Sequence, residues 1–280
     1  MPLFFILSGM VASLSRERNT ALYAWKFIKR RFRQLALPFF IWGLIFTPLV
    51  FKQSHGIYDY SLMAISLLKH PDEGLWFLIV LFCIQIYYYI ACLIGNLLKR
   101  FNMKFSGDII GMLVVLSVLT IVTRYIGTSQ YISLQYTLMF FVGCFILKFR
   151  ILDNAFINAI LLLIFAIIVP YYDFISSPTI FRIFTGIFAS LPIIHICKVT
   201  AESSERVSPF LNFGRHSLEI YATHYCIILG FKQGIRIESL SPIALCLLLF
   251  IISCVLCYLI TQFSSILCKN KYFAMFLYGK

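Results

Sequence analysis

Nine apolar runs separated by short polar gaps dominate the 280-residue sequence. A helix needs about 20 mainly apolar residues to cross a bilayer, with a range near 17 to 25. Because backbone amides in lipid have no water to bind, such runs form helices that satisfy their own hydrogen bonds. We therefore predict an all-α fold, a polytopic membrane helix bundle with about nine transmembrane helices. The predicted spans are about 2–14, which is short, 34–51, 75–98, 108–126, 131–148, 155–172, 180–198, 216–234 and 242–267.

The basic residues lie in the gaps between these runs, and they favour one side of the predicted membrane. If the gap after the first run is cytoplasmic, 18 of the 24 Lys and Arg residues fall on the cytoplasmic side. This bias follows the positive-inside rule, which orients membrane proteins. A net charge of +13 can also indicate nucleic-acid binding, but 61% of the residues are hydrophobic and only 12% are charged. We therefore expect one integral membrane domain over residues 1–280, with no nucleic-acid partner.

Five short motifs lie within or beside the apolar runs. The first three are PLFFILSG at residues 2–9, KFIKRRFRQLALPFFIW at 26–42 and GLWFLIVLF at 74–82. YTLMFFVGCFILK follows at 136–148 and HSLEIYATHYCII at 216–228. In this order, and over essentially the whole chain, the motifs resemble the acyltransferase-3 family of membrane acyltransferases, which modify sugars and other envelope molecules.

The resemblance also implies one more helix than the printed sequence contains. Members of the family usually have ten helices, and the first carries an Arg-to-His signature that includes the proposed catalytic base. In many members a stretch like residues 1–9 follows that helix directly, whereas here this stretch is the start of the chain. We therefore expect an intact member to have an additional first helix, so that the base has no counterpart here. Ser8 and Gly9 match the family's Ser-Gly pair, and we expect them to allow close helix packing.

A basic segment precedes the second span. Lys29, Arg30, Arg31 and Arg33 lie in a predicted interfacial helix that ends before Pro38. Arginine binds phosphate through paired N–H groups, and acyl-CoA carries a pyrophosphate and a 3′-phosphate. These four residues are therefore candidates for binding an acyl-CoA donor, and the family's Arg-rich loop, which is thought to meet the donor, favours this interpretation. The alternative is that the charges only set topology and contact anionic lipid. An apolar stripe accompanies them at helical spacing: Ala21, Trp25, Ile28, Phe32 and Leu35.

The catalytic candidates are Ser217, Tyr221 and His224, which fall within about 60° of one another on the predicted helix 216–234. His224 lies roughly 12 Å from the cytoplasmic end of that helix, and polar groups at such depth normally face the bundle interior. Acyl transfer to a hydroxyl needs a base for the proton and donors for the developing oxyanion. His224 is either this base or the group that orients it. The alternative for His224 is a structural histidine bonded to a neighbouring helix. We expect a structural role for His195 as well.

The function implied by the resemblance is transfer of an acetyl, succinyl or other short acyl group. The donor is acyl-CoA, and the acceptor is a hydroxyl of a cell-surface polysaccharide or glycolipid. This chemistry needs no metal and no permanently bound cofactor. We expect a multi-pass protein in the bilayer of a cell membrane, such as a bacterial inner membrane. Two alternatives are a transporter or flippase for a lipid-linked saccharide, which usually shows paired broken helices, and an inactive, truncated acyltransferase remnant.

Overall fold

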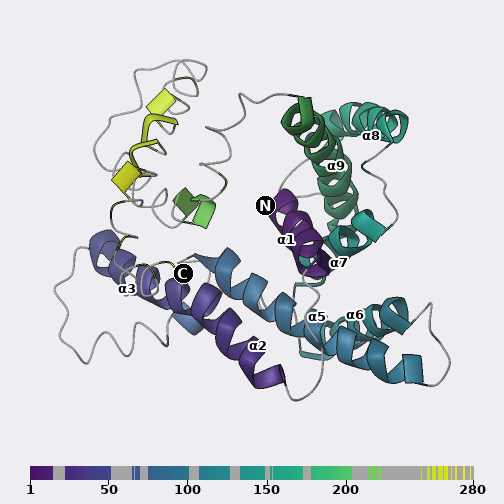
Figure 1. Cartoon of the computed structure of the whole chain (residues 1–280), viewed down its shortest axis with the longest axis horizontal. Helices are drawn as coiled ribbons and strands as arrows, with labels where there is room; N and C mark the ends of the chain where they lie inside the picture. Colours follow the sequence, from purple (N-terminus) through teal and green to yellow (C-terminus); the bar gives the residue numbers. More distant parts are fainter. Residues whose placement is uncertain are drawn as a thin grey trace. The chain divides into compact units, whose positions relative to one another are not determined.

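The structure is a computed structural model in which the described residues form helices and turns (Figure 1). Its contacts divide the chain into two compact units, which are described separately here. Unit 1 comprises Met1–Ile28 and Val80–Ser204, and unit 2 comprises Lys29–Ile79 and Glu205–Lys280. The structure describes residues 1–14, 23–51, 65, 67–69, 75–100, 107–126, 133–148, 152, 154–172, 178–203 and scattered positions between 214 and 278.

Seven of the nine predicted spans are confirmed as helices within the described ranges. Three helical stretches, Trp76–Leu98, Gly107–Tyr125 and Thr179–Glu202, are long and apolar enough to cross a membrane. The all-α membrane helix bundle is therefore confirmed for the part of the chain that is described, whereas the last two predicted spans lie mostly outside it. The helices are α1 (Pro2–Leu14), α2 (Ala24–Arg31), α3 (Leu37–Phe51), α5 (Trp76–Arg100), α6 (Gly107–Ile126), α7 (Leu134–Lys148), α8 (Ala155–Ile168) and α9 (Thr179–Ser203).

Helix α8 shows how local sequence sets the helix ends. Asn154 is its N-cap, and the side-chain Oδ1 accepts a hydrogen bond of 3.2 Å from the Ile157 N–H. This bond satisfies one of the amides that the first turn of a helix leaves without a partner. The helix then tightens into a 3₁₀ turn, Val169–Tyr171, at Pro170, which has no N–H to continue an α-helix. Asparagine and proline therefore delimit the helix.

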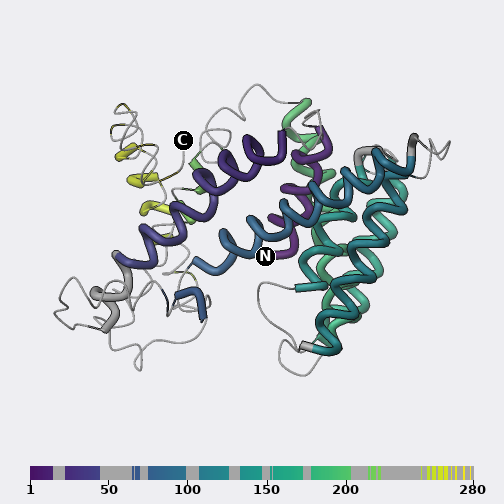
Figure 2. Tube along the Cα trace, turned by 90° about the horizontal axis from the view of Figure 1, so that it is seen from below, coloured from purple at the N-terminus to yellow at the C-terminus, as the bar shows by residue number. Residues whose placement is uncertain are grey.

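Backbone-to-backbone packing of α1 against α7 forms the centre of unit 1. A Cβ added at Gly9 would overlap the backbone oxygen of Phe140, and one added at Gly143 would overlap the backbone oxygen of Ile6. The thiol of Cys144 is 3.3 Å from the Gly9 carbonyl oxygen, which it can reach as a weak donor. The prediction that Gly9 allows close packing is thus confirmed, and Figure 2 shows the purple α1 running beside the teal helices of unit 1.

Two further glycines bring α5 and α6 together in the same way. A Cβ at Gly111 would overlap the backbone oxygen of Ala91, and one at Gly95 would lie 3.0 Å from Asp108 Oδ1. Small residues at such crossings let helix backbones approach closely, which is how helices associate where lipid removes the hydrophobic driving force. In unit 1, α8 and α9 form another packed pair, drawn in teal and green in Figure 1.

The outward faces of the unit 1 helices are apolar, as a lipid environment requires. On α8, Phe156 is 73% exposed and Leu163 is 63% exposed, while on α6 Ile121 and Tyr125 are exposed as well. Monomeric soluble proteins rarely expose such contiguous apolar surface. The buried side is mainly apolar too, with Phe5, Phe140 and Met139 entirely buried. Apolar residues on both sides of the helices are typical of helices that are surrounded by protein and lipid.

Replacing Gly143 with alanine tests the α1–α7 contact. The added methyl group meets backbone that cannot move aside locally, so we expect Gly143→Ala to cost about 1–3 kcal/mol and to lower the Tm of the detergent-solubilised protein by several degrees. Gly214→Ala is the matched control, because no atom lies within 4 Å of a Cβ at that helical position. A Gly143→Ala protein as stable as the Gly214→Ala protein would show that α1 and α7 are not in backbone contact.

Candidate functional site

The predicted basic residues lie on one unbroken helical rod that leads into the second apolar run. Helix α2 passes directly into a π-helical segment, Phe32–Ala36, and that segment passes directly into α3. Figure 2 shows α2, this segment and the first part of α3 as a continuous purple tube. Lys29, Arg30 and Arg31 form the last turn of α2, and Arg33 lies within the π-helical segment. The structure therefore places all four predicted cations within two turns of one helix.

Among these four cations, Arg31 has a distinct environment. Lys29, Arg30 and Arg33 are exposed, whereas Arg31 is half-buried. Its Nη1–H donates a hydrogen bond of 3.1 Å to Gln34 Oε1. Burial, together with a smaller contribution from the neighbouring charge of Arg30, lowers the pKa of the Arg31 guanidinium to about 10. Arg31 is therefore still a cation at neutral pH, but a partly desolvated one that is held in place. A phosphate gains more from such a charge than from one in open water.

The π-helical segment is a feature that sequence reasoning missed. In it the Leu37 N–H donates to the Phe32 carbonyl, five residues earlier, instead of four as in an α-helix. Pro38 explains the change, because its ring would clash with the Gln34 carbonyl in a regular α-helix and it offers no N–H to that carbonyl. Pro38, four residues after Gln34, is the feature of the sequence from which the π-helical segment could have been predicted. Single π-turns inside α-helices are frequently found at functional sites.

Two members of the apolar stripe predicted beside the cations, Trp25 and Phe32, face away from the protein interior. Trp25 is 71% exposed and Phe32 is 43% exposed. Phe27, which the stripe omits, is instead buried, and its ring stacks on Tyr89 of α5 within unit 1 at a centroid distance of 4.7 Å. The exposed stripe fits an interfacial helix whose apolar side faces lipid. Spacing alone identified the stripe but could not show which of two apolar faces meets protein.

Two of the three catalytic candidates lie in described residues, and His224 lies outside them. The Ile220 N–H donates to the His216 carbonyl at 3.0 Å, so the chain is helical around Ser217 and Tyr221. Ser217 is exposed and Tyr221 is half-buried. The predicted stripe of three residues stays a prediction, because its third member is not described.

Tyr221 connects two of the sequence motifs within unit 2. Its ring meets the Phe77 ring edge-on, with centroids 5.4 Å apart. Phe77 belongs to GLWFLIVLF, and Tyr221 belongs to HSLEIYATHYCII. The packing of α1 on α7 likewise joins PLFFILSG to YTLMFFVGCFILK in unit 1. Segments far apart in the sequence, each carrying a motif, are therefore direct neighbours in the fold.

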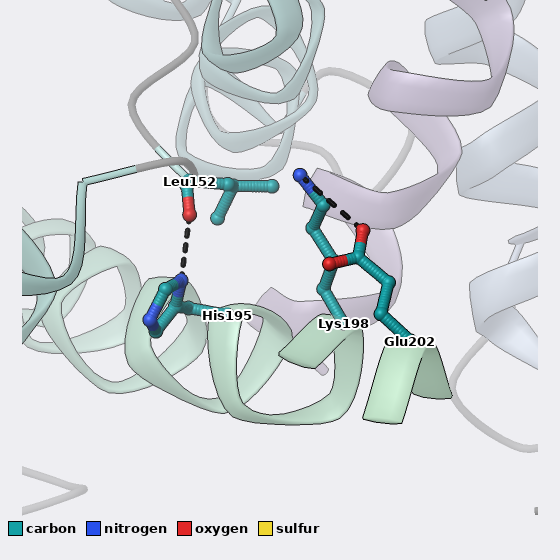
Figure 3. Close-up of polar contacts among 4 residues, drawn as sticks. All are labelled: Leu152, His195, Lys198 and Glu202. Carbon is teal, nitrogen blue, oxygen red and sulfur yellow. Dashed lines mark hydrogen bonds and ion pairs between the residues drawn. The ribbon is translucent and has the colours of Figure 1, made fainter. Parts of the chain in front are cut away.

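His195 has the structural role expected for it. Its ring Nδ1 lies 2.6 Å from the Leu152 carbonyl oxygen, which links α9 to the residues just before α8 (Figure 3). Since a carbonyl oxygen only accepts, Nδ1 carries the proton. One turn further along α9, Lys198 and Glu202 form an exposed ion pair at 3.8 Å. The described residues bring no three His, Cys, Asp or Glu side chains together as metal ligands.

Long apolar helices, two of them packed through glycines, and a basic helix that leads into α3 define an all-α membrane helix bundle with a cationic segment. A family model for the acyltransferase domain of the acyltransferase-3 type matches residues 1–262. The chain therefore belongs to the acyltransferase-3 family and is a membrane acyltransferase. Searches among curated proteins and among solved structures gave no match.

Replacement of His195 tests its structural role. Removing the ring leaves the buried Leu152 carbonyl without this partner, so we expect His195→Leu to cost about 1–2 kcal/mol and to lower the Tm. Lys198→Ala is the control from the same helix, and we expect a change below about 0.5 kcal/mol because exposed ion pairs contribute little. If His195→Leu left the Tm unchanged but abolished acyl transfer, His195 would belong to the active site instead.

Proposed function

We propose that this protein transfers a short acyl group, acetyl or succinyl in the first instance, from acyl-CoA to a hydroxyl of a cell-surface polysaccharide or glycolipid. The family supports acyl transfer in general. The choice of donor rests on one observation, the half-buried Arg31 fixed by Gln34 among three exposed cations. Coenzyme A presents several phosphate charges on one ligand, and a cluster of guanidinium groups with one preoriented member matches that chemistry.

The proposed location is a cell membrane that the chain crosses several times. The uneven distribution of Lys and Arg supports a cytoplasmic position for the Lys29–Arg33 segment. The donor would then approach from this side, with its phosphates at the cationic segment and its thioester directed into the helix bundle. The acceptor, a glycan of the cell surface, would meet the acyl group inside the bundle.

The reaction needs one bond to form and one to break. The acceptor hydroxyl oxygen attacks the thioester carbonyl carbon, a C–O bond forms, and the C–S bond to coenzyme A breaks. The hydroxyl proton passes to the base and from there to the departing sulfur, so that the products are an ester and coenzyme A as the free thiol. His224 is proposed as this base or as the group that orients it. Tyr221 and Ser217 are proposed as hydroxyl donors to the oxyanion of the tetrahedral intermediate.

The donor assignment predicts the effect of replacing Arg31. In membranes supplied with labelled acetyl-CoA, Arg31→Ala should raise the KM for acetyl-CoA by about 10-fold or more, because a partly desolvated charge on phosphate is lost. Arg30→Ala should weaken donor use less, since Arg30 is exposed and more strongly screened. The measurement is the rate of label incorporation into base-labile glycan esters as a function of donor concentration.

Arg124→Ala is the control for these variants, because it also removes one positive charge, here an exposed one in the last turn of α6. It should leave the KM for acetyl-CoA unchanged. Equal effects of Arg31→Ala and Arg124→Ala would contradict the donor assignment. Movement of a glycan across the membrane without formation of any ester would contradict acyl transfer itself.

A further inference from the structure

A buried amide in the middle of α5 has an oxygen that no described residue reaches with a hydrogen bond. Gln85 is only 6% exposed, and its Oε1 finds no partner in the described part of the chain. An unpaired buried amide oxygen costs free energy, and the membrane interior offers no bulk water to compensate for it. Proteins keep such a group where it is needed for something other than stability. Gln85 therefore needs an explanation that the fold alone does not give.

Gln85 lies near the middle of the apolar stretch Trp76–Leu98. Gln85 comes nine positions after Trp76, so the two residues are about 14 Å apart along the helix axis. A polar side chain at such depth faces the interior of a bundle rather than lipid, and its burial agrees with that.

The neighbouring residues show which way this part of α5 faces. Gln85, Tyr88 and Cys92 recur at spacings of three and four, so they lie on one face of the helix. The Tyr88 ring meets the Phe140 ring of α7 at a centroid distance of 5.6 Å, so this face is directed at α7. Cys92 is buried, whereas Tyr88 is only half-buried. The Gln85 amide therefore lies on the protein-facing side of α5, on the face that meets α7.

We infer that Gln85 Oε1 is a binding group that accepts a hydrogen bond from a hydroxyl of the acyl acceptor inside the helix bundle. This inference rests on the proposed function, because it takes the acceptor to be a polyhydroxylated molecule. An amide oxygen can only accept, so its ligand must present an O–H or N–H donor, and a glycan presents many. The pantetheine arm of acyl-CoA also carries amide N–H groups. The kinetic test below distinguishes a hydrogen bond from the acceptor hydroxyl from one donated by the pantetheine arm.

The test uses Gln85→Met, which keeps the length and approximate volume of the side chain and removes its hydrogen-bonding atoms. The donor is acetyl-CoA, and the acceptor probe is the membrane's own envelope glycan after removal of its esters with mild base. With saturating acetyl-CoA, we expect the KM for this glycan to rise roughly 3- to 30-fold, while the KM for acetyl-CoA stays within about 2-fold. The Tm without substrates should be unchanged or higher, because an unpaired buried group has been removed.

Thr120→Val is the matched control. It also replaces a polar side chain on a membrane helix by an apolar one of equal size, but Thr120 is exposed on α6 and its hydroxyl already bonds the Leu116 carbonyl at 2.8 Å. Both KM values should stay unchanged in this variant. A lower Tm of Gln85→Met with unchanged KM values would overturn the inference and make Gln85 structural. A rise in the KM for acetyl-CoA alone would overturn it in favour of the pantetheine arm.

A binding measurement separates this inference from the proposed function. The Tm of the wild-type protein is measured with the de-esterified glycan in the absence of acetyl-CoA. We expect the glycan to raise this Tm in the wild type and not in Gln85→Met. If the wild type shows this shift but makes no ester, the proposed reaction fails and the inference stands. If the wild type makes esters and Gln85→Met shows the same shift and the same KM values, the inference fails and the proposed reaction stands.

Discussion

The close approach of α1 and α7 is the contact on which the rest of unit 1 depends. In lipid, helices gain little from burying apolar side chains against each other, so association relies on van der Waals contact between surfaces that fit. Gly9 and Gly143 supply such surfaces, each lying directly on the backbone of the facing helix. The aromatic contacts around this crossing, including Phe5 stacked on Tyr136 at 4.6 Å, then fix the helices against rotation. Two family motifs are thus two halves of one packing interface.

A second feature is the group of basic residues in the segment that leads into α3. The rod formed by α2, the π-helical segment and α3 carries its cations at one end and apolar residues at the other. Within that segment Arg31 differs from its neighbours because it is partly withdrawn from water and held by Gln34. The functional proposals follow from this separation. In these proposals, a phosphate-bearing donor binds at the basic segment, and a neutral acceptor hydroxyl binds in the apolar interior at the amide of Gln85.

Much of this architecture could be predicted from the sequence, because runs of apolar residues in lipid have few alternatives to helices. Helices α5 and α9 begin and end within a few residues of the predicted spans, and Gly9 has the packing role expected of a small residue.

The π-helical turn was missed because periodicity arguments assume 3.6 residues per turn throughout. Phe27 was missed because spacing does not tell a lipid-facing stripe from a protein-facing one. Gln85 was overlooked as one polar residue in an apolar run, since its lack of a partner depends on contacts that only the fold reveals. Of the catalytic candidates, Ser217 and Tyr221 are placed on a helix, and the stripe with His224 is still a prediction.

The central claim is that an acyl donor docks on the basic side of the membrane and gives its acyl group to a glycan within the bundle. The most direct test compares sealed inside-out vesicles with sealed right-side-out vesicles from cells that produce the protein. Labelled acetyl-CoA, which does not cross the bilayer, is added to the outside of each, and glycan esters are counted. The account predicts ester formation in inside-out vesicles and little in right-side-out ones. Ester formation at equal rates in both preparations, or only in right-side-out vesicles, would contradict it.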